Sequence, residues 1–253
     1  MKFNNICVAL ALVASFAYTT AQARPIPDAK SVLDKLAKQY TILGRYADVS
    51  MNVVREERQE VIHFEVFSAD ENRLRLEVGN PPRIKGSAIV RNSENLWVSM
   101  PRIDSVRHYT IKNTKNSSDQ TVFGSDLRLS DLFGSFGSYA NKMERKELLS
   151  DSEFMMILTS PDGLQRLTME LDAQDLPQVI TVEEKIQGDK FMPVRRLRVS
   201  KWAGVDAARR PEYLVIEDLK KPTRYTQVEI MAWVGGKVFP DYMFEKPELK
   251  AKD

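Results

Sequence analysis

Two histidines and a serine–aspartate pair are the residues of this sequence that could carry catalytic chemistry. His63 alternates with apolar residues in the pattern of a β-strand, and His108 lies in a similar segment. Neither has a second histidine or an acidic residue at ligand spacing, so we predict no metal site. Ser125 and Asp126 are adjacent, but no histidine base is placed near them to activate the serine. We predict that Gly124, Ser125 and Asp126 form a turn, and that the protein is not an enzyme, has no catalytic residue and needs no cofactor.

The only cysteine, Cys7, lies in an N-terminal segment that is typical of an exported protein. A basic residue precedes an apolar run over residues 6–17, and a cleavage site of the A-x-A type ends at Ala23. The run is shorter than the roughly 20 apolar residues that cross a bilayer. We therefore predict a cleavable signal peptide over residues 1–23. The mature chain, residues 24–253, should work in a bacterial periplasm without disulfides or thiolate metal ligands.

The charge balance argues against nucleic acid as the main partner. The sequence holds 37 Lys and Arg against 35 Asp and Glu, whereas phosphate binding needs a basic surplus on one face. The basic clusters at residues 195–198 and 209–210 alternate with apolar residues or adjoin a proline, so we predict that they lie on a solvated strand face or loop. No segment after the signal peptide is apolar enough to span a membrane.

An amphipathic helix is predicted over residues 27–46. Apolar residues recur there at spacings of three and four, with charged residues between them. Asp28 or Ser31 can cap its start, and Gly44 marks its end. The apolar stripe of this helix includes Leu33, Leu36 and Tyr40.

Most of the remaining sequence alternates with period two, which predicts half-buried antiparallel strands. An interruption at residues 113–146 is first polar and then rich in glycine and serine, and we predict a short helix over residues 138–149. The predicted strands are residues 48–53, 61–67, 73–78, 86–91, 95–100, 105–111, 153–159, 165–171, 178–184, 194–202, 210–218 and 223–234.

So many strands cannot form one flat sheet, because open twisted sheets rarely exceed about 10 strands without curling. We predict a mainly β protein with a single domain over residues 24–253. Its architecture should be a half-open antiparallel β-barrel of about a dozen strands, covered by amphipathic helices. Such a barrel has an apolar interior, which is a candidate site for lipid.

Three segments carry a resemblance to a known family. Residues 95–107 combine Trp97 and Pro101 with a basic hairpin strand, and residues 123–126 read Phe-Gly-Ser-Asp. Together with residues 239–244, they resemble the periplasmic outer-membrane lipoprotein-sorting (LolA-like) family over essentially the whole mature chain. Leu127 stands where that family usually has an aromatic residue. The segment 164–171 and the tail also differ from the best-known carrier, so the resemblance implies the fold but not a named cargo.

The resemblance implies a lid of helices over a hydrophobic cavity that holds acyl chains. The expected function is therefore that of a periplasmic carrier or chaperone for acyl chains of lipids or lipoproteins in outer-membrane sorting. An envelope transporter or a membrane receptor is the expected partner for transfer. Two alternatives remain: a non-enzymatic accessory or sensor module that docks on an envelope transporter of the export-pump type, and an enzyme.

The candidate cavity residues on the strands share one parity, while Arg75 and Glu77 occupy the alternate positions. Trp97 has the opposite parity, and the arrangement with Trp97 facing inward is the alternative. The candidate acyl-chain residues are Leu33, Leu36, Tyr40, Leu74, Leu76, Val78, Leu96, Val98 and Met100.

Overall fold

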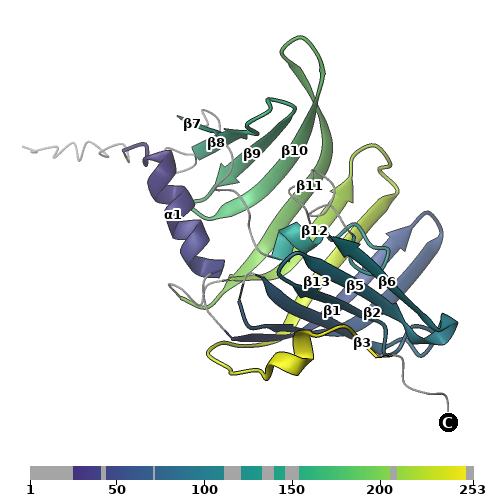
Figure 1. The fold of residues 1–253 in the computed structure, drawn as a ribbon. Helices are drawn as coiled ribbons and strands as arrows, with labels where there is room; N and C mark the ends of the chain where they lie inside the picture. The colour runs from purple at the N-terminus through teal and green to yellow at the C-terminus, as the bar shows by residue number, and fades with distance from the viewer. Residues whose placement is uncertain are drawn as a thin grey trace, which may run out of the picture.

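One curled antiparallel sheet dominates the protein (Figure 1). The computed structural model describes residues 25–40, 44–70, 72–110, 121–132, 140–145, 154–205 and 210–248. Within these residues, thirteen strands form the sheet in the order β6-β5-β4-β3-β2-β1-β13-β12-β11-β10-β9-β8-β7. The strands are β1 (Arg45–Arg55), β2 (Arg58–Ser68), β3 (Arg73–Asn80), β4 (Ala88–Asn92), β5 (Asn95–Met100), β6 (Ser105–Thr110), β7 (Ala140–Arg145), β8 (Phe154–Thr159), β9 (Gln165–Leu171), β10 (Pro177–Gln187), β11 (Lys190–Ala203), β12 (Arg210–Asp218) and β13 (Arg224–Val234).

The sheet consists of two meanders, β1–β6 and β7–β13, that are joined by the pairing of β1 with β13. This pairing runs from Tyr46 opposite Val234 to Arg55 opposite Arg224. The outermost strands, β6 and β7, do not pair with each other, so the sheet curls without closing (Figure 1). The predicted half-open antiparallel barrel is confirmed.

The twelve predicted strands are all present, and the thirteenth, β7, corrects a prediction. Residues 138–149 were expected to include a helix, but residues 140–145 form a strand along β8, with Met143 opposite Met156. Alanine, lysine, methionine, glutamate and arginine in this segment favour a helix. Pairing with β8 outweighs that preference, because it satisfies the backbone hydrogen bonds of the segment in the sheet.

The predicted amphipathic helix is α1 (Ala29–Tyr40), shorter than expected. The Asp28 carboxylate accepts a hydrogen bond of 3.0 Å from the Ser31 amide, so Asp28 is the residue that caps the helix. α1 lies beside the β7–β10 end of the sheet (Figure 1) and contacts β7. Ala29, Val32 and Leu36 are its buried residues among those whose side chains are described.

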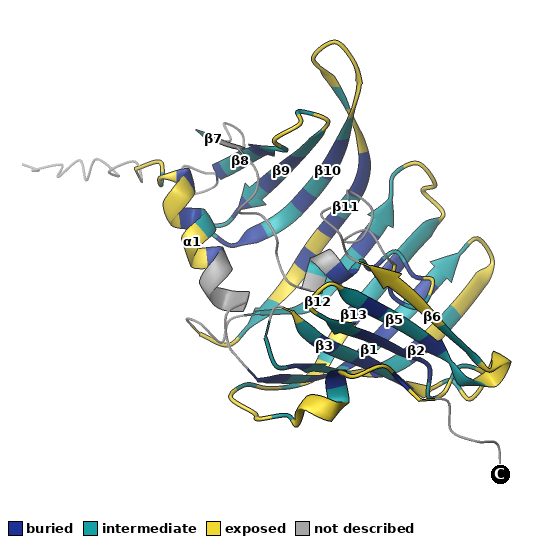
Figure 2. Ribbon diagram, in the orientation of Figure 1, coloured by how far each residue is buried: buried dark blue, intermediate teal, exposed yellow. Residues whose placement is uncertain are grey.

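The core lies on the concave face of the sheet. Buried and more exposed residues alternate along most of the strands (Figure 2). The buried residues of α1 and of β1–β5 and β8–β13 form one hydrophobic cluster. A single core over these eleven strands is what a period-two sequence pattern produces when one face of each strand is covered.

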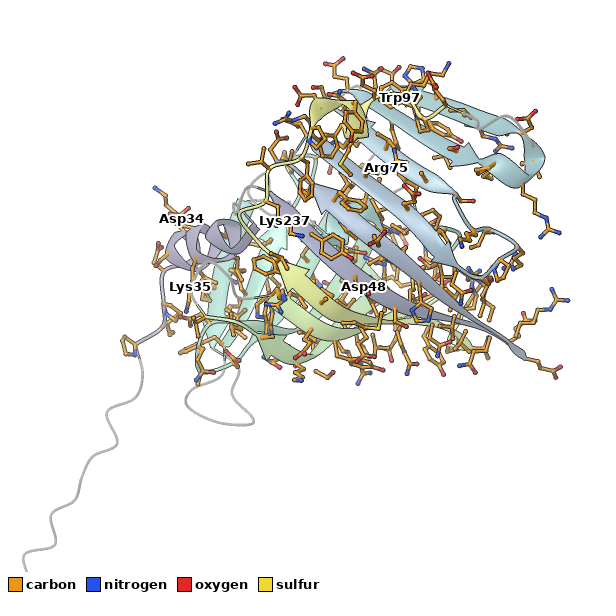
Figure 3. All side chains as sticks on the ribbon, turned by 90° about the horizontal axis from the view of Figure 1, so that it is seen from below. Asp34, Lys35, Asp48, Arg75, Trp97 and Lys237 are labelled. Atoms are coloured by element: carbon orange, nitrogen blue, oxygen red, sulfur yellow. The ribbon has the colours of Figure 1, made fainter. Side chains whose placement is uncertain are left out.

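The C-terminal segment, residues 235–248, packs on the opposite, convex face. Its 3-10 turn η4 (Asp241–Phe244) contacts β3 and β4, and Phe244 is buried there. Arg73 donates a hydrogen bond of 2.7 Å to Asp241, and the rings of Phe239 and Phe67 meet edge to face at 5.8 Å. Lys237, labelled in Figure 3, lies 4.8 Å from the ring of Tyr46. The segment is therefore a strap that covers the outside of the sheet.

Gly44 joins this strap to the start of β1, and we expect it to tolerate no side chain. Its carbonyl accepts a hydrogen bond of 2.8 Å from the Lys237 amide, its φ is +66°, and an added Cβ would lie 1.7 Å from the Lys237 carbonyl oxygen. Gly163 has a similar φ of +67° but open space around it. In urea denaturation, Gly163→Ala should cost only the ~1–2 kcal/mol of a left-handed backbone, and Gly44→Ala should cost more. Equal losses would contradict the contact.

Candidate functional site

A stripe of apolar side chains crosses the concave face in register. Each residue of the stripe is the direct cross-strand partner of the next, so all of them lie on one face of the sheet. Thr226 is the one polar residue among them, and it is fully buried. The stripe is Val53, Thr226, Ile216, Leu197, Ile180, Met169, Met156 and Met143, from β1 through β13 to β7.

The other meander continues this face with the residues that the sequence indicated. Leu76 is opposite Ile89 and Val66, and Val98 is opposite Ile89, so these side chains share the concave face. Leu74, Leu76, Val78 and Leu96 are buried, whereas Val98 and Met100 are partly exposed. Their role in binding a ligand stays a prediction.

Trp97 lies on the convex face, as does Arg75, and both are labelled in Figure 3. Its ring stacks on His108 with centroids 5.5 Å apart, and His108 Nε2 is 2.8 Å from the side-chain oxygen of Asn95. The strand pairing thus places Leu96 on the concave face and Trp97 on the convex face. His108 is occupied by contacts on the outside of the sheet.

The helix residues of the candidate site lie over the β7–β10 part of the concave face. Leu36 is buried in the hydrophobic cluster, and Leu33 is partly buried against it. The side chain of Tyr40 lies outside the described residues. Lys35 ties α1 to the turn before β10, because its ammonium donates to the Gln174 carbonyl and lies 3.5 Å from Asp175. These are polar contacts on the exposed side of an otherwise apolar interface.

A second cover for the concave face comes from residues 121–132, here called the inner segment. Val122, Leu127 and Leu129 are buried in the hydrophobic cluster, and the Phe123 ring meets Phe64 at 5.7 Å. The Ser125 hydroxyl donates a hydrogen bond of 2.6 Å to the Val122 carbonyl, which closes the turn predicted at residues 124–126. The turn therefore has a structural role inside the curled sheet, and η2 (Leu129–Leu132) follows it.

A buried ion pair anchors the inner segment to β11. The guanidinium of Arg195 donates to both oxygens of Asp131, and the two side chains are only 7% and 10% exposed. Arg195 also donates a hydrogen bond of 2.8 Å to the Asp126 carbonyl. The prediction of a solvated cluster at residues 195–198 is therefore wrong for Arg195. It holds for Arg198, which is half exposed and paired with Glu217.

Two further arginines surround the carboxylate of Asp126. One of its oxygens lies 3.6 Å from Arg55 and 3.6 Å from Arg224, and the other accepts a hydrogen bond of 3.1 Å from the Thr226 hydroxyl. The Asp126 amide in turn donates to the Thr226 oxygen at 3.0 Å. In the serine–aspartate pair that the sequence singled out, Asp126 is thus an ionic attachment point.

No group of three or more histidine, cysteine, aspartate or glutamate side chains that could hold a metal ion occurs in the described ranges. A pocket beside α1 is lined by Asp28, Lys30, Ser31, Asp34 and Lys35, so it is polar and belongs to the outside of the helix (Figure 3). Across the same ranges, no helix has the length and apolar character needed to cross a bilayer.

A half-open sheet with a covered apolar face is the fold of LolA-like proteins, and solved structures match it. A LolA superfamily protein from Nitrosomonas europaea has a TM-score of 0.65 at 17% identity, over 87% of this chain and 98% of that chain. A putative outer membrane lipoprotein-sorting protein domain from Vibrio parahaemolyticus has a TM-score of 0.69 at 14% identity, over 87% and 98%. A DUF1329 family protein from Desulfovibrio piger has a TM-score of 0.70 at 15% identity, over 85% and 95%.

The sequence itself matches a protein-family model that is described as an uncharacterized protein, over residues 70–251. The chain belongs to that family, and the resemblance to LolA-like proteins is confirmed in its fold. No curated protein matches the sequence.

Proposed function

We propose that the protein is a periplasmic carrier or chaperone that holds acyl chains of lipids or lipoproteins on the concave face for outer-membrane sorting. The observation that carries the proposal is the continuous apolar face, which runs through eight strands in register and is covered by α1 and the inner segment. The similarity to a putative outer membrane lipoprotein-sorting domain supports it.

Binding of an acyl chain would replace apolar contacts between the concave face and its cover with contacts between the face and the chain. Burial of each acyl methylene contributes about 0.8 kcal/mol. A chain of ordinary length therefore offers enough free energy to displace part of the present cover. Release then needs only a partner that binds the opened form better than the closed form.

α1 is suited to be the displaceable part of the cover. It has 12 residues, and an isolated helix of that length is marginal in water, so its stability depends on packing. Among the strands of the described chain, α1 contacts chiefly β7, and β7 is an edge strand. Movement of α1 would uncover the β7 end of the stripe without breaking the sheet.

Leu36→Ala tests this lid. We expect the variant to change the affinity or release rate of a fluorescent long-chain fatty acid more than it lowers the melting temperature. The reason is that a lid must be displaceable, so that ligand can replace part of the contact that the Leu36 side chain makes with the core. Hydrogen exchange in residues 30–43 should also change when ligand binds. Asp34→Ala, on the exposed side of the same helix, is the control and should leave both readouts unchanged. A Leu36→Ala protein that simply unfolds, with exchange unaffected by ligand, would show that α1 is permanent core.

We also propose that residues 1–23 are a cleaved signal peptide and that residues 24–253 form one lipid-binding domain. The basic start, the apolar run and the A-x-A site support this. N-terminal sequencing of the exported protein should start at Arg24. Residues before Ala21 in the exported form would contradict the cleavage site.

The second candidate function is a module that docks on an envelope transporter. The hairpin of β10 and β11 supports it, because this hairpin projects beyond its neighbours (Figure 1) and exposes Ile186 and Met192 near its tip. Exposed apolar side chains on a projecting element are typical of contact surfaces. A protein that binds no lipid but is captured by a transporter through this hairpin would favour the docking function.

A further inference from the structure

Two arginines face each other on neighbouring strands at one end of the concave face. Arg55 on β1 is the direct cross-strand partner of Arg224 on β13. Like charges in that arrangement are destabilising. An anion between them relieves this repulsion, and in this structure the anion is the carboxylate of Asp126. Arg55 also donates a hydrogen bond to the Gly124 carbonyl of the same segment.

The carboxylate of Asp126 satisfies these arginines incompletely. It lies 3.6 Å from each guanidinium, which is longer than a hydrogen bond. Arg55 Nη1 and Arg224 Nε are buried without a hydrogen-bond partner in the described part of the protein. Buried donors of this kind are rare in proteins, and each one calls for an explanation.

Arg195 adds a third guanidinium from β11. Its side chain is 7% exposed, and its Nε is also buried without a hydrogen-bond partner among the described residues. Asp218 is opposite Arg195 in register, but its carboxylate accepts a hydrogen bond of 3.0 Å from the Lys220 amide at the β12–β13 turn. Three guanidiniums thus converge on two carboxylates, Asp126 and Asp131.

These arginines border the apolar stripe. Thr226, which holds Asp126, is itself a member of the stripe between Val53 and Ile216. The inner segment therefore places the Asp126 carboxylate beside the arginines. It also places apolar side chains, such as Leu127, against the adjoining apolar face. In chemical terms it occupies the place of an amphiphile with an anionic head and an apolar tail.

We propose that Arg55, Arg195 and Arg224 bind the phosphate headgroup of an acyl-bearing amphiphile, in competition with the inner segment. The inference rests on the proposed acyl-chain function and names the headgroup that goes with it. A phosphate presents more oxygens and more charge than one carboxylate, and guanidinium forks match that geometry. Its oxygens would supply acceptors for the buried donors that Asp126 leaves unpaired.

The test is displacement of a neutral apolar fluorescent probe by dodecyl phosphate, by dodecanol and by inorganic phosphate. The wild-type protein should bind dodecyl phosphate at least about tenfold more tightly than dodecanol, the equivalent of one charged hydrogen bond. Arg224→Gln and Arg55→Gln should each remove most of that preference, measured as the ratio of the two affinities, because any loosening of the inner segment would affect both ligands alike. Arg198→Gln, on the convex face, is the matched control and should keep the preference.

Asp126→Asn separates a ligand site from a structural anchor. If phosphate competes with this carboxylate, the variant should gain several-fold more affinity for dodecyl phosphate than for dodecanol, whereas a purely structural anchor would raise both affinities equally. Equal binding of dodecyl phosphate and dodecanol in the wild type overturns the headgroup site but leaves the acyl-chain function intact. Binding of neither amphiphile refutes the acyl-chain function itself. Inorganic phosphate that binds as tightly as dodecyl phosphate overturns the lipid assignment, because the acyl chain then contributes nothing.

Discussion

Arg195→Met is expected to lower the free energy of unfolding by about 3–5 kcal/mol, because it leaves the carboxylate of Asp131 buried without its partner. The same change removes the hydrogen bond from Arg195 to the Asp126 carbonyl, so both attachments of the inner segment to β11 are lost together. Urea denaturation measures the effect, and exposure of the concave face should also increase binding of an apolar dye.

Arg198→Met is the matched control for this prediction. Arg198 is on the same strand and also pairs with a carboxylate, Glu217, but its side chain is 51% exposed. Exposed pairs contribute only about 0–1 kcal/mol. Similar losses for the two variants would mean that the inner segment is not held by a buried ion pair.

Leu76→Ala should cost about 2–5 kcal/mol, because Leu76 is fully buried on the concave face in the middle of β3. Leu76→Asp should cost more, since it places an unpaired carboxylate in the core. Affinity for a fluorescent fatty acid should fall in whichever variant remains folded, because the same face is proposed to hold the chain.

Glu77→Ala tests the assignment of the two faces. Glu77 is the next residue on β3, lies on the convex face and pairs with Arg75 at 2.7 Å while 41% exposed. Its loss should change stability by about 0–1 kcal/mol and leave ligand binding unchanged. A Leu76→Asp protein that keeps both its fold and its lipid uptake would contradict the assignment of the concave face.

Most of the strands could be predicted from the sequence because apolar and polar residues alternate along them. β7 could not, since five of its six residues favour a helix and the segment becomes a strand only beside β8. The end of α1 was also misplaced, although Gly44 was identified correctly as a break in the pattern and adopts a φ of +66°.

The anchors of the inner segment could be predicted only in part from the sequence. Arg195 has the same parity as Leu197 and Val199, so period two alone could have placed it on the buried face. Its partner could not be found in that way, because Asp131 is 64 residues distant. The meeting of Arg55 with Arg224 depends on how the first and last strands pair, and a single sequence does not contain that register.

The central claim is that the concave face holds acyl chains, and extraction of the purified protein tests it most directly. The protein should be isolated without detergent, analysed by native mass spectrometry, and extracted with organic solvent. We expect a bound amphiphile with at least one long acyl chain, in substoichiometric to equimolar amount, that is lost from Leu76→Asp but retained by Glu77→Ala. A wild-type protein that carries no acyl-bearing molecule and takes up none when it is offered would contradict it.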